Sequence, residues 1–270
     1  MISIAKKELY QFFSSLTGYI TIILFLLVNA LYLFVLKDSN IFDFGYATLS
    51  AFFDLAPWIF IFLIPALGMR SFAEEFKSGT FETLKTSPLT KWQIVLGKYI
   101  AILIVIIIAI IPTFLYVITI YSLSSSSGID TGTFKGSNII QYMSSLIDYI
   151  IFHWRNLGID SGAIVGSYIG LFFLASVFAA ITTWCSSLTS NAVIAFLLSC
   201  FSCIVLYFGF SAISKLPVFT GNADYYIEML GIDFHYQSVS RGVVDTRDVI
   251  YFFSLIFIFL FATQKNLNKK

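Results

Sequence analysis

Charged residues are scarce in this sequence. Asp, Glu, Lys and Arg make up 11% of its 270 residues, whereas 58% of the residues are hydrophobic and the mean hydropathy is +0.88. A soluble domain of this length cannot bury so much apolar surface and leave so few charges to face water. The formal net charge of +1 also argues against nucleic acid as a partner, because nucleic-acid-binding surfaces are strongly basic. The composition therefore predicts a membrane protein.

Cysteine and histidine are also rare, and their spacing gives little support to a metal or redox site. The three cysteines, Cys185, Cys200 and Cys203, lie within or at the edge of apolar segments. The spacing of Cys200 and Cys203 suits a redox or metal pair, but no further ligands cluster nearby, so we interpret these thiols as small buried side chains. His153 and His235 lie far apart and lack the H-E-x-x-H spacing of zinc proteases. We interpret both histidines as polar residues at the membrane interface.

Motifs that bind nucleotides or form a catalytic nucleophile are absent as well. In the chain's only Gly-Lys pair, Gly97–Lys98, Trp92 occupies the position of the first glycine of a G-x-x-x-x-G-K-S/T phosphate loop. The G-x-S-x-G pattern of serine hydrolases fails at Ile213. The apolar segments carry no charge near their centres, where ion-coupled carriers usually need one. We therefore expect a chain that is not an enzyme, while an ion-coupled carrier or channel and a membrane-bound enzyme stay open as alternatives.

The long apolar segments predict the fold. A helix of about 20 mostly apolar residues crosses a bilayer. Six segments meet or approach this length: residues 18–36, 52–69, 98–123, 163–184, 192–213 and 249–263. We predict an all-α polytopic membrane protein with six transmembrane helices in one domain that spans residues 1–270.

The distribution of Lys and Arg predicts the orientation. If the N-terminus is inside, ten basic residues fall in inside segments and six in outside segments. Short cytoplasmic loops carry the excess of Lys and Arg, so this count places both termini, and the segment 70–98 between spans two and three, in the cytoplasm.

This cytoplasmic segment reads as a charged amphipathic helix over residues 71–85. Ser71 is placed to cap its N-terminus, with Glu74 at the capping-box position, and Pro88 follows its end. Gly79 interrupts the helix, which a bend or close contact there would justify. The apolar stripe of the helix consists of Phe72, Phe76, Thr80 and Leu84. A helix that merely rests on the membrane surface is the alternative interpretation.

The long outside segment, residues 214–248, precedes the last span. Asp245 is placed to cap the last helix, and Asp248, three residues later, favours the positive end of that helix. We expect short helices on the outer face before this span.

Three separated motifs carry a resemblance to a known family. The first is Arg70-x-Phe72-x-x-Glu75-x-x-x-Gly79-Thr80-x-Glu82-x-Leu84, followed by Pro88-Leu89-Thr90 and Gly97-Lys98. The second is the N-terminal KKELYQFFSSLTGYI, and the third is GIDFHYQSVSRGVVDTRDVIYF before the last span. In this order, and over nearly the whole chain, they resemble ABC-2 type transporter permeases, whose N-terminal amphipathic helix leads into the first span.

Within that family, three stretches look most like the permease subunits of gliding-motility-associated ABC transporters: APWIFIFLIPALGMRSF, WQIVLGKY and the third motif. The outer loop departs from that pattern, because residues 124–157 look inserted. The resemblance implies an exporter linked to gliding motility, with a polysaccharide, drug or lipid permease of the same family as the alternative.

The resemblance also implies partners and a location. A separate cytoplasmic ABC ATPase would bind ATP and Mg, so no cofactor is expected in this chain. Two ATPases would pair with two permease subunits, surrounded by membrane lipid, in the bacterial cytoplasmic (inner) membrane. The cytoplasmic helix would be the coupling helix, and its expected coupling residues are Phe72, Glu74, Glu75, Gly79, Thr80, Glu82, Leu84, Lys85 and Pro88. Of these, the charged residues with Gly79 and Thr80 would contact the ATPase, and Phe72 and Leu84, together with Phe76, would pack toward the permease.

Overall fold

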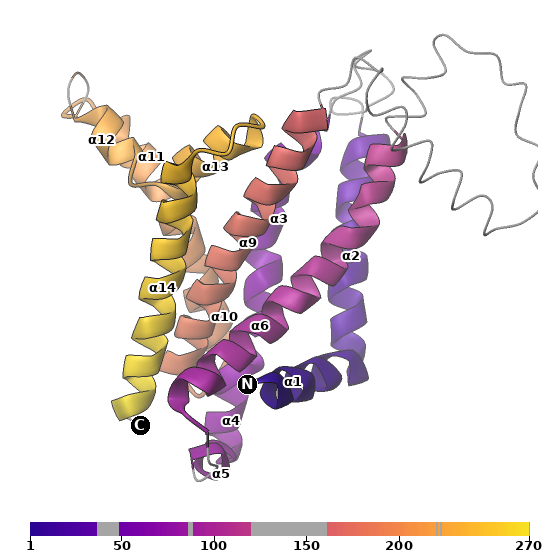
Figure 1. Cartoon of the computed structure of the whole chain (residues 1–270), viewed down its shortest axis with the longest axis vertical. Coiled ribbons are helices and arrows are strands. Elements are labelled where there is room, and N and C mark those ends of the chain that lie inside the picture. Colours follow the sequence, from indigo (N-terminus) through magenta and orange to yellow (C-terminus); the bar gives the residue numbers. More distant parts are fainter. Residues whose placement is uncertain (37–48, 86–88, 120–160, 220, 222, 270) are drawn as a thin grey trace, which may run out of the picture.

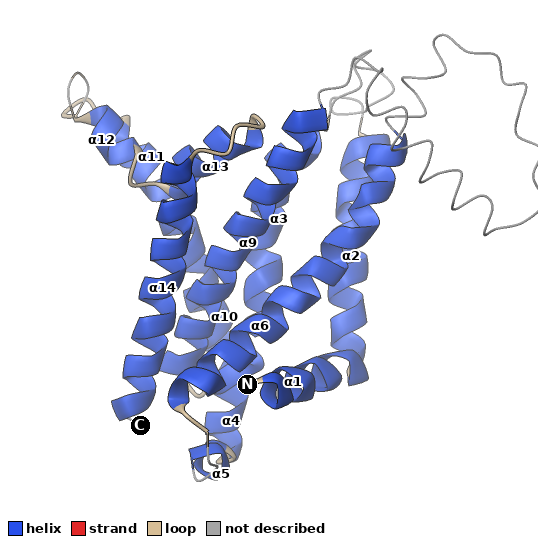
Figure 2. Cartoon of the chain, in the orientation of Figure 1, coloured by secondary structure: helices blue, strands red, loops and turns tan. Residues whose placement is uncertain are grey.

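A computed structural model describes residues 1–36, 49–85, 89–119, 161–219, 221 and 223–269. Over these residues the chain is built from helices and turns, without a strand, as Figure 2 shows. The insertion expected at 124–157 and Pro88 lie outside the described residues. The all-α prediction is confirmed.

Among the residues that the structure describes, five helices are long and apolar enough to cross a membrane. They are Ser50–Ser78, Lys91–Thr119, Gly162–Leu188, Ala192–Ser214 and Thr246–Asn268. A sixth span results if α1 (Ile2–Ser14) and the following helix, bent against each other by 73°, are counted together. That following helix, α2 (Leu16–Phe34), corresponds to the predicted first span, and α1 is the predicted N-terminal amphipathic helix.

The helix α9 (Ser161–Leu188) forms the centre of the bundle. It packs against α3 (Ser50–Gly68), α6 (Lys91–Ile110), α10 (Ala192–Ile204) and α14 (Thr246–Lys269). Its middle is built from small and apolar residues that are fully buried, among them Leu174, Ala175, Phe178 and Ala179. Small residues let neighbouring helices approach closely inside a membrane, where burial from water does not drive association.

Two irregular turns interrupt the spans. A 3-10 turn, η1 (Ile111–Thr113), follows α6 at Pro112, and a π turn, η2 (Val205–Gly209), joins α10 to α11 (Phe210–Ser214). Proline cannot donate a backbone hydrogen bond, which accounts for the first of these breaks.

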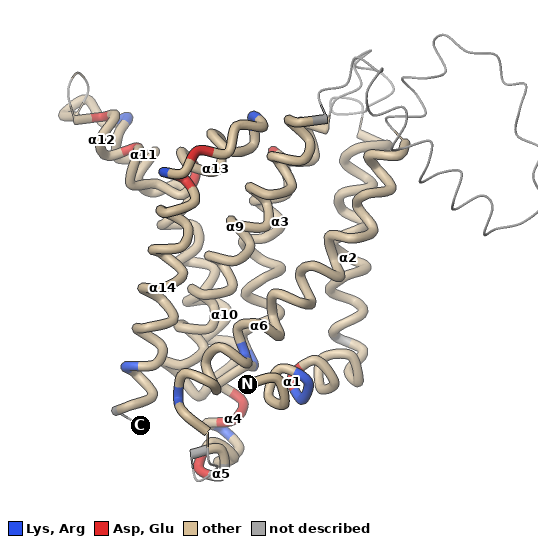
Figure 3. Tube along the Cα trace, viewed as in Figure 1, with Lys and Arg blue, Asp and Glu red and all other residues tan. Residues whose placement is uncertain are grey.

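Both chain ends lie at the same end of the bundle, together with α4 (Arg70–Ser78) and α5 (Phe81–Lys85), as Figure 1 shows. We call this the inner end. The opposite, outer end carries α12 (Asp224–Glu228) and α13 (Ile232–Ser240), which are the helices expected before the last span. Figure 3 shows the charged residues gathered at the two ends, with an uncharged stretch between them. The termini and the charged segment therefore share one side, as the charge count predicted.

The prediction of one separate helix over residues 71–85 is wrong at two points. The chain runs from α3 through Met69 into α4 as one continuous helix, so Ser71 lies inside a helix and does not cap one. Gly79 then ends α4 in the left-handed conformation, with φ of 71°, and α5 begins after it. Glycine reaches this conformation without the steric cost that a side chain imposes, so it terminates helices in this way. The bend that Gly79 suggested is present.

Local capping signals place two helix starts. The Thr90 hydroxyl accepts a hydrogen bond from the Gln93 backbone, and the Gln93 side chain accepts one from the Thr90 backbone, so α6 begins at Lys91 and runs on into the span predicted from residue 98. At the outer end, the Asp245 carboxylate accepts a hydrogen bond from the Arg247 backbone at 3.1 Å, which confirms the predicted cap of α14.

Candidate functional site

The expected coupling residues divide into exposed and buried sets on α4 and α5, which protrude from the inner end of the bundle (Figure 1). Glu74, Gly79, Thr80 and Glu82 are exposed to solvent. Phe72 is fully buried and Leu84 is half-buried. Lys85 is the last residue of α5. The structure thus leaves four of the expected residues free for contact with a partner.

Aromatic side chains attach α4 and α5 to the bundle. Phe72 stacks on Phe76 with ring centroids 6.1 Å apart, and Phe76 meets Phe81 edge-on at 4.9 Å. Phe72 and Phe81 belong to the buried core, and Phe76 packs against it. The three rings bridge the break at Gly79, so α5 is held to α4 despite the change in chain direction.

Ser186, near the end of α9, fastens the junction between α3 and α4. Its hydroxyl accepts hydrogen bonds from the backbone N–H groups of Phe72, at 3.0 Å, and Ala73, at 3.2 Å, and donates one to the carbonyl of Met69, at 3.0 Å. All three contacts are with backbone atoms. A displacement of α4 is therefore passed directly to the central helix of the bundle.

Four charged side chains from three helices form a second connection, which we call the ion cluster: Lys7 and Glu8 of α1, Glu75 of α4, and Lys98 of α6. Lys98 is 1% exposed, and its ammonium group lies 2.7 Å from Glu8 Oε1 and 3.0 Å from Glu75 Oε2. Lys7 Nζ lies 3.2 Å from Glu75 Oε1. The cluster contains two positive and two negative charges, so its members neutralise one another.

Lys98 also makes two contacts that complete its surroundings. It donates a hydrogen bond of 2.5 Å to the carbonyl of Ser71 and lies 5.0 Å from the centre of the Phe72 ring. A buried ammonium group is costly unless its donors are paired, and here two carboxylates, one carbonyl and one ring surround it. The cluster consequently holds α4 against α6.

Glu75 was expected to contact the ATPase, but the structure buries its side chain. Its side chain points into the ion cluster and the residue is only 8% exposed, so its carboxylate is engaged with two lysines of this chain. The physical reason is Lys98, which needs a second counter-charge in addition to Glu8 to be buried.

The other members of the ion cluster were missed. One signal for Lys98 was present in the sequence: a lysine at the start of an apolar run must snorkel or find a carboxylate. Gly97 supplies the space for this arrangement, because a Cβ atom there would lie 3.0 Å from both Ile4 Cβ and the Met1 carbonyl. The Gly97–Lys98 pair therefore lets α1 approach α6 and then binds it through Glu8.

The interpretation of His235 as a polar residue at the membrane interface is also wrong. His235 is buried rather than interfacial, with Nδ1 2.6 Å from Asp248 Oδ1 and Nε2 2.9 Å from the Met229 carbonyl. Its ring stacks on Tyr251 at 3.8 Å. Asp248, which was expected only to favour the positive end of α14, thus ties α13 to α14 through His235.

Metal ligands do not gather in the part of the chain that the structure covers, where no group of three or more His, Cys, Asp or Glu residues could hold an ion. The three cysteines are buried free thiols. The charged side chains of the ion cluster join helices at the inner end, whereas Glu74 and Glu82 are exposed to solvent.

Comparison with known families gives one match. Residues 37–227, more than half of the chain, match the family described as ABC-2 family transporter protein. The matched region contains α3 to α6, including the exposed residues of α4 and α5, together with α9 and α10. No curated protein sequence gives a significant match.

Proposed function

The chain belongs to the ABC-2 transporter family, and on this premise we propose that it is a permease subunit driven by a separate cytoplasmic ABC ATPase docked on α4 and α5. The proposed docking surface consists of the exposed residues Glu74, Gly79, Thr80 and Glu82. ATP and Mg would be bound by the ATPase, which supplies the free energy of hydrolysis.

The continuity of α3 and α4 is the observation that supports this proposal. Together α3 and α4 form a candidate span of 29 residues, Ser50–Ser78, from the outer end to the docking surface, and Met69 between them keeps a right-handed helical backbone. At about 1.5 Å per residue such a helix is on the order of 40 Å long. A push on α4 therefore moves α3 as a lever, without an intervening flexible loop.

The remaining contacts make the lever act on the whole bundle. Ser186 joins the middle of the lever to α9, and the ion cluster joins it to α1 and α6. Closure of two docked ATPases would rotate these helices together and change which side of the membrane is open, as coupled rigid-body motions do in other switching proteins.

The finer assignments form part of the same proposal. We place the docking surface and both termini in the cytoplasm, with the chain in the bacterial inner membrane, because basic residues predominate on that side. We further propose an exporter linked to gliding motility, which pairs with a second permease subunit. Export of a polysaccharide, drug or lipid by the same mechanism is the alternative, and the motif resemblance is what favours the first assignment.

Charge reversal on the docking surface tests the proposal. Glu74→Lys and Glu82→Lys should each weaken co-purification of the ATPase about tenfold, a loss of roughly 1.4 kcal/mol, because exposed interface charges steer and align a partner. The ATPase is identified in the purified complex by a peptide containing G-x-x-x-x-G-K-S/T. Glu228→Lys, at the outer end, is the matched control and should leave the complex unchanged.

Two results would contradict the proposal. If both inner-end variants retain the ATPase as the control does, α4 and α5 are not the docking surface. If the chain transports cargo in vesicles without any ATPase, an ion-coupled carrier or channel is the better assignment.

A further inference from the structure

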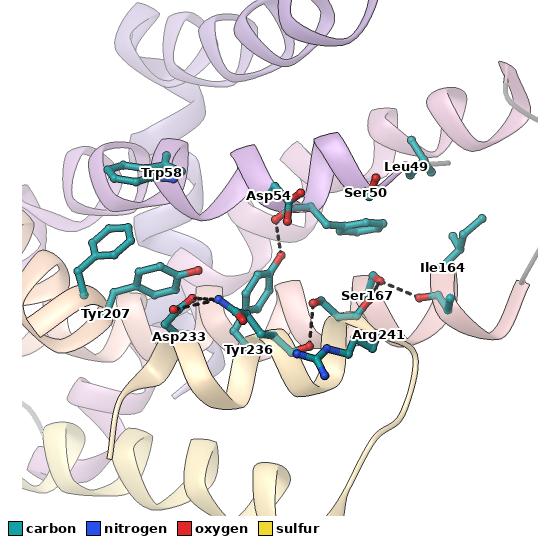
Figure 4. Close-up of a pocket in the computed structure, with 15 residues that line it drawn as sticks. Leu49, Ser50, Asp54, Trp58, Ile164, Ser167, Tyr207, Asp233, Tyr236 and Arg241 are labelled. Atoms are coloured by element: carbon teal, nitrogen blue, oxygen red, sulfur yellow. Dashed lines mark hydrogen bonds between the residues drawn. The ribbon is translucent and has the colours of Figure 1, made fainter. Parts of the chain in front are cut away.

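A pocket of about 670 Å³ opens at the outer end of the bundle, far from the proposed docking surface. Figure 4 shows its walls: α3 contributes Asp54 and Trp58, α13 contributes Asp233 and Tyr236, and the π turn contributes Tyr207. The contacts described for the inner end do not involve this pocket.

Aromatic rings form one side of the pocket. Trp58 is 54% exposed and packs on Phe208 with ring centroids 4.4 Å apart, and Phe208 in turn meets Tyr207 edge-on at 4.6 Å. The π turn Val205–Gly209 contains both Tyr207 and Phe208. Such turns insert a residue into a helix and occur frequently at functional sites.

Two carboxylates lie on opposite walls of this pocket, and neither pairs with a cation among the residues that the structure describes. Within the described part of the chain, Asp54 makes no hydrogen bond and no ion pair. Asp233 accepts hydrogen bonds from the neutral amide of Gln237, at 3.0 and 3.1 Å, and the neutral hydroxyl of Tyr207 also interacts with its carboxylate. The one basic residue of the lining, Arg241, lies on the side of the pocket away from Trp58 and Tyr207 (Figure 4).

Tyr236 lies close enough to both carboxylates to be affected by their charges. Its hydroxyl donates a hydrogen bond of 2.7 Å to the carbonyl of Phe53. Burial raises the pKa of Tyr236 well above its ordinary value, and the negative charges of Asp54 and Asp233 raise it further. The phenol of Tyr236 therefore stays neutral. Both carboxylates make the electrostatic potential around it more negative.

We propose that this pocket binds an organic ammonium group, with Asp54 and Asp233 as counter-charges and the rings of Trp58 and Tyr207 as apolar walls. Neither Asp54 nor Asp233 forms an ion pair with a described residue, so an ammonium group would supply the counter-charge. Aromatic faces attract ammonium groups and pack against their methyl substituents, as in cages for quaternary ammonium ligands. A polyhydroxylated ligand would use the same rings but would not need two uncompensated negative charges.

The test compares choline with its neutral carbon isostere, in which a tert-butyl group replaces the trimethylammonium group. Binding to the purified full chain in a non-ionic detergent is measured by calorimetry. We expect saturable binding of choline and at least tenfold weaker binding of the isostere, because only the charge differs. Equal affinity for the two ligands, or preference for a neutral polyol, would overturn the proposal.

Two variants connect the binding to the carboxylates. Asp54→Asn and Asp233→Asn keep the side-chain shape and should each weaken choline binding tenfold or more, whereas Glu228→Gln, at the same end but outside the pocket, should not. Thermal unfolding of each variant verifies that it is folded. Unchanged choline binding in both folded Asn variants would overturn the proposal. No ATPase is needed, so this result is independent of the proposed function.

Discussion

The two ends of the molecule treat charge differently. At the inner end, Lys7, Glu8, Glu75 and Lys98 neutralise one another and hold three helices together. At the outer end, the described residues give Asp54 no hydrogen bond or ion pair and give Asp233 the neutral partners Gln237 and Tyr207. The inner charges thus hold helices together, whereas we propose that the outer carboxylates bind a ligand.

The contrast does not follow from position alone, because the outer end also contains a carboxylate that is hydrogen-bonded within the fold. Asp248 is buried against His235, and the pair joins α13 to α14 a short distance along the chain from the pocket. An acid at the outer end can thus bind another helix of the fold through one of its oxygens. Among the described residues Asp54 has no such contact, although it lines a cavity.

The largest expected effect comes from removing the centre of the ion cluster. Lys98→Met leaves Glu8 and Glu75 without their shared cation and should lower stability by about 3–5 kcal/mol. Thermal unfolding in detergent measures the loss, and Lys77→Met, an exposed lysine of α4, is the control. Adding Glu8→Gln and Glu75→Gln to Lys98→Met should restore most of the stability. A Lys98→Met protein as stable as the control would show that the cluster is not structural.

An intermediate effect distinguishes the buried acid of α4, Glu75, from the exposed acid of α5, Glu82. Glu75→Gln should cost about 1–3 kcal/mol, because it leaves buried donors poorly paired, whereas Glu82→Gln should stay within about 0.5 kcal/mol. ATPase binding should follow the opposite order and weaken in Glu82→Gln only. Measuring unfolding and co-purification on the same samples tests both halves. If the same variant shows the larger loss in both unfolding and co-purification, the separation of structural from docking residues is wrong.

The smallest effect concerns the turn between α4 and α5. Gly79→Ala should cost about 1 kcal/mol, because alanine resists the left-handed conformation while a Cβ atom there meets nothing within 4 Å. Gly209→Ala is the matched control, since that glycine has φ of −59° and only an ordinary contact at 3.6 Å. Thermal unfolding compares the two. A neutral Gly79→Ala would show that the turn does not depend on glycine.

Features encoded locally were predictable from the sequence. The spans follow from runs of apolar residues, and the caps at Thr90 and Asp245 follow from short-range hydrogen-bonding patterns. The outer helices were expected from the polar segment before the last span. In each case the residues that decide the structure lie within a few positions of one another.

Features that depend on contacts distant in sequence were not predictable. Glu75 looks like one more exposed charge on an amphipathic helix until Lys98 is placed beneath it. Nothing near α4 in sequence indicates that Ser186 would bind it, and Asp54 and Asp233 are brought together only when α13 folds back over α3 and α9. The residues that we propose for coupling to the ATPase and for binding a ligand are therefore defined by contacts between helices, which the sequence alone does not give.

Photo-crosslinking from the docking surface tests the central claim most directly. A photoreactive phenylalanine analogue replaces Thr80, exposed at the inner end, or Tyr226, which is 70% exposed at the outer end. The co-purified complex is irradiated, and the ATPase is identified by its phosphate-loop peptide. We predict a permease–ATPase adduct from position 80 and none from position 226. An adduct from position 226, or none from position 80 while the ATPase co-purifies, would contradict docking on α4 and α5.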